Sequence, residues 1–256
     1  MRCFYRERKW ICGDYMEVEL YPVWQTSPKR RRARCKPTSE IQQKLNEKNA
    51  REKLTRLVHC NFFRGDYSAG LDYDVSPESE EQALCDIQKF FRKARKLYKA
   101  ADREMKYIWV MERRPRSGDI HFHIFISGGV DRTALEALWG HGYYNTKALR
   151  FKETGVTGLC IYSIKDDLRG RRWNSSHNLV KPQPQVNNYR ITQKNVKRLQ
   201  ENSDVRAEFE GLYSGYTFVD CERAFVNKIN RGVYVTARFY RSAARVLGEK
   251  EKTGGN

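Results

Sequence analysis

The pattern of apolar and polar residues along the chain predicts a mixture of strands and helices. Strands are indicated where apolar and polar residues alternate, or where short apolar runs are bounded by turn residues, because side chains alternate between the two faces of a sheet. The two central runs are separated by a segment that contains the turn residues Pro115 and Gly118. Strands are predicted at residues 15–21, 61–63, 69–73, 107–111, 120–126, 216–219 and 233–240.

Helices are predicted where apolar residues recur every three or four positions, or where a capping residue precedes such a stretch. The clearest case begins after Pro77, with apolar residues at helical spacing from Ala83 to Leu97. A Ser/Thr pair at residues 38–39 and the carboxylate of Asp131 indicate two further helix starts. Helices are predicted over about residues 40–57, 78–97, 132–138 and 158–168.

These elements predict an α+β fold, with a mainly antiparallel sheet of about five strands and helices packed on it. We expect three segments along the chain. Residues 1–57 form a basic N-terminal strand, an arm and a helix, residues 58–241 form the main domain, and residues 242–256 form a flexible basic tail. The arm carries five basic residues within positions 29–34, which favours contacts with phosphates.

Charge narrows the class of partner. The chain has 49 Lys and Arg residues against 31 Asp and Glu residues, a net charge of +18, with aromatic residues among the basic ones. This distribution favours a nucleic acid over a membrane surface. No apolar run reaches the ~18 residues that span a bilayer, and the N-terminus lacks the apolar core of a signal peptide, so we expect a cytoplasmic protein. Seven cysteines without a C-x-x-C pair are expected to be reduced.

The most specific segment for chemistry is residues 120–126, Ile-His-Phe-His-Ile-Phe-Ile. On a strand, His121 and His123 point to one face while the residues between and after them pack into the core. Glu112 ends the preceding predicted strand, and the turn brings it beside the histidines. Two imidazoles and one carboxylate form a divalent-metal site with open positions. Structural histidines, and a Glu112 that only pairs with Arg113, are the alternatives.

A second segment offers a nucleophile. On the helix predicted at residues 158–168, Tyr162 and Lys165 are three positions apart and therefore share a face. Apolar neighbours are expected to anchor this helix to the sheet. A tyrosine that only packs is the alternative, because a Tyr-x-x-Lys spacing is common by chance.

Taken together, the His-hydrophobic-His strand, the upstream Glu112 and the downstream helical Tyr-x-x-Lys resemble the HUH superfamily of replication initiators, relaxases and related transposases. The closer resemblance is to rolling-circle replication-associated proteins of bacterial prophages and plasmids. One departure lies at residues 69–73, Ala-Gly-Leu-Asp-Tyr, where that family usually has a Thr-Leu-Thr-Tyr-like motif. Gly70 and Asp72 stand where hydroxyl side chains would contact DNA. Further segments that carry the resemblance are the arginine-rich arm before residues 37–40, Asn61-Phe62, Gly65-Asp66, residues 170–173 and 176–179, and Lys181-Pro182.

The resemblance implies a HUH endonuclease fold with an RRM-like palm, and the activity of a metal-dependent, site-specific nickase and strand transferase. Tyr162 would attack a phosphodiester of single-stranded DNA, forming a 5′-phosphotyrosine link and freeing a 3′-hydroxyl that primes rolling-circle replication. A Mg or Mn ion on Glu112, His121 and His123 would polarise the phosphate, and Lys165 would steady the developing negative charge. Reversal of the same step would rejoin strands.

The substrate implied by the resemblance is single-stranded or hairpin DNA at a replication origin in a bacterial host. No G-x-x-x-x-G-K-[ST] motif occurs, so we expect no nucleotide-binding ATPase domain and a separate helicase as a partner. We expect Arg and aromatic side chains to hold the strand. The residues expected to contact DNA are Arg113, Arg171, Arg172, Trp173, Asn178 and Lys181.

Three other functions remain open at the level of the sequence. A single-tyrosine HUH transposase or relaxase would share the site and move DNA instead of priming replication. A non-catalytic protein that binds single-stranded nucleic acid would use the same basic, aromatic sheet and would be indifferent to Tyr162→Phe. A non-haem iron oxygenase also uses two histidines and a carboxylate, but it requires neither Tyr162 nor a net charge of +18.

Overall fold

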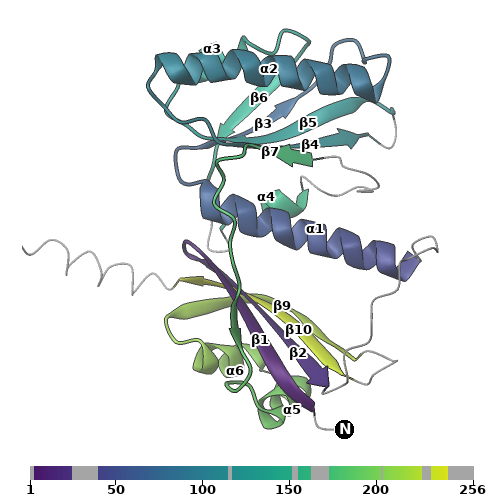
Figure 1. Cartoon of the computed structure of the whole chain (residues 1–256), viewed down its shortest axis with the longest axis vertical. Helices are drawn as coiled ribbons and strands as arrows, with labels where there is room; N and C mark the ends of the chain where they lie inside the picture. Colours follow the sequence, from purple (N-terminus) through teal and green to yellow (C-terminus); the bar gives the residue numbers. More distant parts are fainter. Residues whose placement is uncertain are drawn as a thin grey trace, which may run out of the picture. The chain divides into compact units, whose positions relative to one another are not determined.

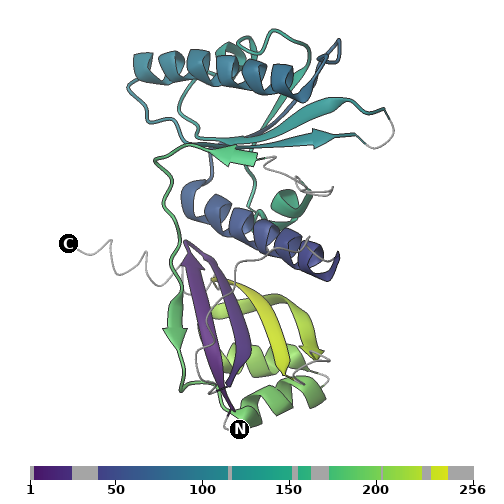
Figure 2. The same ribbon diagram turned by 45° about the vertical axis from the view of Figure 1, so that its right-hand side comes forward.

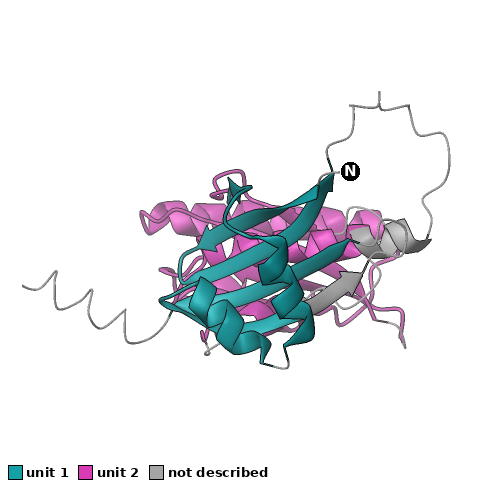
Figure 3. Ribbon diagram, turned by 90° about the horizontal axis from the view of Figure 1, so that it is seen from below, with its two compact units in different colours: residues 1–38, 182–256 teal, residues 39–181 magenta. Residues whose placement is uncertain are grey.

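The computed structural model describes residues 3–24, 40–114, 117–151, 155–162, 173–202, 204–226 and 232–241. These residues form two five-stranded antiparallel sheets and six helices. The predicted α+β class is confirmed, whereas only one sheet of about five strands was foreseen. The chain divides into two compact units, unit 1 of residues 1–38 and 182–256, and unit 2 of residues 39–181 (Figure 3).

Unit 2 is built on a sheet with the strand order β6-β3-β5-β4-β7 (Figure 1). Its strands are β3 (Tyr67–Leu71), β4 (Tyr107–Arg113), β5 (Ile120–Ile126), β6 (Tyr144–Ala148) and β7 (Trp173–Ser175). Its helices are α1 (Glu40–Asn61), α2 (Glu80–Ala100), α3 (Arg132–Glu136) and α4 (Thr157–Tyr162). Figure 1 shows α2 on one side of the sheet, and α4 and α1 on the other. The central strand β5 is therefore covered on both faces.

The two faces of this sheet carry separate apolar clusters, because alternate strand residues point to opposite sides. On the α2 side, Phe122 and Ile124 of β5 pack with Ile87 and Phe90 of α2. On the other side the cluster is smaller: it contains Phe125 of β5, together with Ile108 and Val110 of β4 and residues of α1 and α4. The predicted α2 amphipathicity and the predicted strands β4 and β5 are confirmed.

Helix starts in unit 2 follow the expected capping chemistry. Ser79 caps α2, since its side chain accepts a hydrogen bond from the backbone N–H of Gln82. Asp131 caps α3 as predicted and accepts from the N–H of Ala134 at 2.7 Å. Each cap satisfies one of the N–H groups that a helix leaves without an internal partner.

Unit 1 forms the second sheet, with the strand order β8-β1-β2-β10-β9. Its strands are β1 (Cys3–Cys12), β2 (Tyr15–Trp24), β8 (Gln185–Asn187), β9 (Tyr216–Val226) and β10 (Val233–Arg241). The helices α5 (Gln193–Glu201) and α6 (Val205–Leu212) cover one face of this sheet (Figure 2). A two-residue turn joins β1 to β2, and its Gly13 has a φ of 61°, which glycine adopts without a steric penalty.

Several expectations about individual elements need correction. The strand predicted at residues 61–63 is wrong: α1 runs to Asn61, and the N–H of Phe62 continues the helical pattern by donating to the carbonyl of Val58 at 3.0 Å. The sequence patterns did not foresee β1, β6, β7, β8, α5 or α6. Of the helix predicted at 158–168, residues 158–162 are helical, and the rest lies outside the described residues.

The division into units differs from the domain boundaries expected at residues 57 and 241, because the sheet of unit 1 pairs strands from both ends of the chain. The α1 helix belongs with unit 2. Six of the seven cysteines lie in the described part of the chain, and these six are free. No helix among the described residues is long and apolar enough to cross a bilayer.

Candidate active site

The β4–β5 hairpin brings the three predicted metal ligands together. Its register sets Glu112 directly opposite His121, and it sets His123 opposite Val110 on the same face. The Nε2 atom of His123 lies 2.9 Å from Nε2 of His121 and 2.8 Å from Oε2 of Glu112. The remaining separation, from His121 Nε2 to Glu112 Oε2, is 3.3 Å. The three ligand atoms therefore converge on one point.

This donor set suits a divalent cation. Hydrogen bonds alone serve it poorly, because a single proton on His123 Nε2 faces both a second imidazole nitrogen and a carboxylate oxygen. Ligands about 2.1 Å from a common ion lie roughly 3.0 to 3.4 Å from one another in octahedral or tetrahedral arrangements. The observed separations of 2.8 to 3.3 Å are close to that range. One cation would satisfy all three atoms at once.

The electrostatic environment favours neutral imidazole at His121. Burial lowers the pKa of His121, and the neighbouring His123 lowers it further, against the attraction of Glu112 and Asp72. A neutral ring keeps a lone pair for a metal. Among the described residues, the buried Nδ1 of His121 has no hydrogen-bond partner. The site is thus organised around Nε2.

An ion pair next to the ligands escaped the sequence reasoning. Asp72 follows β3, and its Oδ1 accepts a hydrogen bond from Nη2 of Arg114 at 2.7 Å. Asp72 raises the pKa of His121 and Arg114 lowers it, so both charges act at the metal site. Asp72 was noted in the sequence only as part of a departure from the family motif. The strand register, which sequence patterns do not fix, gives it this position.

Tyr162 ends α4 beside the metal ligands. Its ring centroid lies 5.7 Å from that of His123, and the two ring planes meet at 75°. The helix is anchored by Cys160, which is fully buried in the α1-side cluster, while 52% of Tyr162 is exposed. The phenol therefore has access to solvent and lies against a metal ligand.

A buried histidine fixes the start of this helix. The N–H of Val156, just before α4, donates to Nε2 of His59 at 3.3 Å, and Nδ1 of His59 lies 2.8 Å from the carbonyl of Thr55. These bonds require the proton on Nδ1, which donates to Thr55. Burial lowers the pKa of His59 to about 4, so the ring is neutral near pH 7. His59 thus ties α1 to the segment that carries Tyr162, whereas the sequence indicated only that it is not a metal ligand.

A row of cross-strand neighbours crosses the sheet at His123. Gly70 of β3 lies opposite His123, and Asn145 of β6 lies opposite Gly70. On the other side, Val110 separates His123 from Trp173 of β7. A Cβ atom added at Gly70 would meet no atom of the described residues within 4 Å. The altered family motif therefore leaves open space next to a metal ligand.

The residues expected to contact DNA lie in different surroundings. Arg113 is exposed at the end of β4, where it donates to the carbonyl of Gly118 at 3.0 Å and pairs with Glu80 at 3.3 Å. Trp173 is half-buried, and Nζ of Lys53 lies 5.6 Å from its ring centroid. Both residues lie on strands that flank the metal ligands.

The other predicted DNA contacts are not brought to the site. The side-chain amide of Asn178 donates to Glu104 at 2.9 Å and to the carbonyl of Met105 at 3.1 Å. These partners precede β4, so Asn178 lies about 20 Å from Glu112 along the strand. Lys181 is exposed at the end of unit 2. Lys165, Arg171 and Arg172 lie outside the described residues.

Comparisons with known proteins agree with this arrangement. No curated protein matches the chain. A crystal structure of the hypothetical protein ORF119 from Sulfolobus islandicus rod-shaped virus 1 is similar at 14% identity, with a TM-score of 0.31, and the match covers 47% of this chain and 97% of that one. That likeness is too weak to bear on the fold. Residues 66–167, which include the three candidate ligands and Tyr162, match the family of the replication-associated protein ORF2, and this confirms the resemblance to replication-associated proteins.

Proposed function

We propose that unit 2 is a metal-dependent endonuclease that nicks single-stranded DNA at a replication origin through a 5′-phosphotyrosine intermediate, and that it also rejoins strands. One observation carries the proposal: the half-exposed ring of Tyr162 lies 5.7 Å from that of His123, beside three converging metal ligands. The family match at residues 66–167 supports the broader assignment to replication initiation.

In the proposed reaction, Oη of Tyr162 attacks the phosphorus of a phosphodiester. A bond forms between that oxygen and phosphorus, and the bond to the 3′-oxygen breaks. The 3′-oxygen leaves with the electron pair and takes a proton from water, while the phenolic proton passes to solvent. The reverse step rejoins the strand. A divalent ion held by Glu112, His121 and His123 would supply charge stabilisation at the phosphate oxygens.

Several features support a single-stranded substrate over a duplex. Tyr143 is 63% exposed, and its carbonyl accepts a hydrogen bond from the N–H of Asp72, whose carboxylate acts on His121. An exposed aromatic ring near the ligands suits the stacking of an unpaired base. The open space above Gly70 leaves room for a strand beside His123. Lys165 as a second catalytic group, a separate helicase and a bacterial cytoplasm belong to the same proposal.

The proposal is tested by incubating the protein with Mn and a library of labelled single-stranded oligonucleotides, followed by denaturing electrophoresis. The wild-type protein is expected to give a denaturation-resistant protein–DNA band, with peptide mass spectrometry locating the link at Tyr162. Tyr162→Phe is expected to lose this band completely and to bind the oligonucleotide without covalent attachment. The matched control Tyr143→Phe removes another exposed phenol of unit 2 and is expected to keep the band.

Two outcomes would overturn the proposal. A wild-type protein that binds single strands but never forms the adduct is a binding module. An adduct that persists in Tyr162→Phe assigns the nucleophile elsewhere.

A further inference from the structure

A second basic surface of unit 2 lies on α2, across the sheet from the metal ligands (Figure 1). Five cations of this helix fall on one side of it at helical spacing, because positions three and four apart share a face. The buried residues of α2, such as Ile87 and Phe91, fall on the opposite side and pack on the sheet. We call this surface the α2 stripe, and it consists of Lys89, Arg92, Lys93, Lys96 and Lys99.

The charges of the α2 stripe are exposed and largely uncompensated. All five residues are exposed. Lys89 pairs with Asp86 at 3.1 Å, whereas the other four form no hydrogen bond or ion pair with another described residue. Like charges three or four positions apart on a helix repel one another. A polyanion laid along the helix would relieve this repulsion.

We propose that the α2 stripe binds the phosphate backbone of duplex DNA. From Lys89 to Lys99 the helix rises about 15 Å, and a duplex presents one negative charge per ~1.7 Å of its axis, so several phosphates lie within reach. The stripe contains no aromatic side chain on which unpaired bases could stack. None of the exposed large hydrophobic residues in the described part of the chain lies on α2, so the helix has nothing to insert into a membrane.

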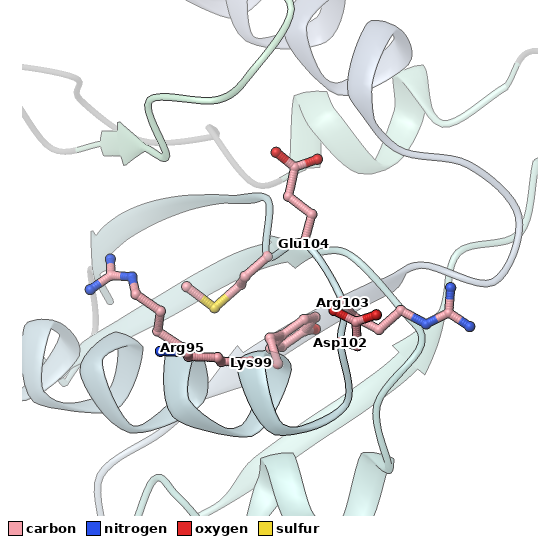
Figure 4. Close-up of a pocket in the computed structure, with 7 residues that line it drawn as sticks. Arg95, Lys99, Asp102, Arg103 and Glu104 are labelled. Carbon is pink, nitrogen blue, oxygen red and sulfur yellow. The ribbon is translucent and has the colours of Figure 1, made fainter.

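The pocket at the end of α2 favours an extended polyanion over a small anion. It has a volume of about 350 Å³ and is lined by Arg95, Lys99 and Arg103, but also by Asp102 and Glu104. Figure 4 shows the Arg95 and Arg103 side chains extending in opposite directions, and Glu104 pointing away from both. The cations do not converge on one point, as a site for a single phosphate requires. They act as a surface.

This inference goes beyond the proposed nicking reaction and does not depend on it. Cleavage of a single strand uses the side of the sheet with His121 and His123, whereas the α2 stripe would hold double-stranded DNA on the other side. A protein without nuclease activity could still bind duplexes in this way.

The test compares two triple variants of the full chain that remove the same charge. Arg92→Gln, Lys96→Gln and Lys99→Gln together neutralise the stripe, and Lys194→Gln, Lys197→Gln and Arg198→Gln together neutralise exposed cations of α5. Affinity for a 30-base-pair duplex without single-stranded ends is measured by fluorescence anisotropy at about 50 to 200 mM salt. The stripe variant is expected to lose about tenfold or more in affinity at 100 mM, with a log–log salt slope smaller by about 2 to 3. The α5 variant is expected to change affinity less than twofold.

Equal losses in the two variants would mean that only overall charge matters, and no loss in either would mean that the stripe does not contact DNA. A stripe variant that loses affinity for single strands but keeps it for the duplex would overturn the assignment to duplex DNA. Unchanged melting temperatures serve as the folding control, because all six residues are exposed. The Mn-dependent adduct with a short single strand reports separately on the nicking proposal, and the stripe variant is expected to keep it.

Discussion

The two faces of the sheet in unit 2 are built from alternate residues of the same strands, yet they differ in nearly every physical respect. On the α2 side, Phe122 and Ile124 of β5 lie in a continuous apolar cluster, and the only charges are on the far surface of the helix. On the other side, the apolar cluster ends at Phe125, and His123 and His121 follow along the strand beside Glu112. One face thus supplies stability, and the other trades packing for polar atoms held close together.

The comparison shows how rigidity reaches the candidate site. His121 and His123 are spaced by a single residue whose ring, Phe122, is fully buried on the opposite face. Motion of either imidazole along the sheet would have to move that ring within a close-packed core. The polar side therefore takes its geometry from the apolar one.

Loss of a metal ligand is expected to have the largest effect. His123→Ala removes the nitrogen that lies between the other two ligand atoms, so Mn binding measured by calorimetry is expected to disappear. Cleavage of a single-stranded oligonucleotide is expected to fall by about a thousandfold, because charge stabilisation at the phosphate is lost. The matched control His177→Ala removes an exposed histidine and is expected to change neither quantity. Undiminished Mn binding in His123→Ala would place the ion elsewhere.

Adjacent substitutions on β5 separate the two faces by stability. Phe122→Ala is expected to lower the free energy of unfolding by about 3–5 kcal/mol, because it leaves a cavity in the α2-side core. His121→Ala is expected to lower it by less than about 1 kcal/mol without metal, because the buried Nδ1 of His121 has no hydrogen-bond partner among the described residues. Urea unfolding in the presence of a chelator measures both. Equal losses would contradict the division of roles between the faces.

Acid is expected to weaken the attachment of α4 to α1. The pKa of His59 is about 4 in the folded protein and about 6.5 in the unfolded chain, so the unfolded state binds more protons between these values. The free energy of unfolding should therefore be full above about pH 6.5 and fall as pH drops toward 4, by about 2 kcal/mol between pH 7 and 5. His59→Gln keeps an acceptor for the N–H of Val156 and does not titrate. Urea unfolding at several pH values should show a shallower pH dependence in this variant, and identical curves would exclude His59 as the source.

The smallest expected effect concerns the open space at Gly70. Gly70→Val adds a side chain that meets no described atom and suits a strand, so stability and Mn affinity are expected to change little. Binding of a single strand beside His123 is expected to weaken by about tenfold, which is about 1.4 kcal/mol. Anisotropy with a labelled oligonucleotide measures this, and Ser68→Val on the same strand is the control. Unchanged binding in Gly70→Val would mean that the strand does not cross β3 there.

The sequence was informative where chemistry and periodicity are local. The His-x-His spacing predicted which side of β5 carries the candidate ligands, and the apolar spacing of α2 predicted its buried face. Asp131 was recognised as a helix cap because capping depends on residues only three positions away. The convergence of Glu112 with the histidines also follows from a local hairpin.

The remaining features depend on contacts that are distant along the chain. Strand β1 alternates charged and apolar residues irregularly, and it becomes a strand by pairing with β2 and β8. Likewise, nothing near His59 in the sequence indicates that its ring accepts a hydrogen bond from Val156, 97 residues away. The position of Asp72 beside His121 follows from the register of β3 on β5.

The order of strands in unit 1 bears on how the protein is made. Leu20 of β2 pairs with Val235 of β10, so the first hairpin waits for a neighbour that leaves the ribosome about 10–40 s later at ordinary rates of synthesis. A lone hairpin is at best marginally stable. The continuous unit 2 can complete its sheet during this interval, and a chain interrupted after residue 181 would carry a finished candidate nuclease and an orphaned hairpin.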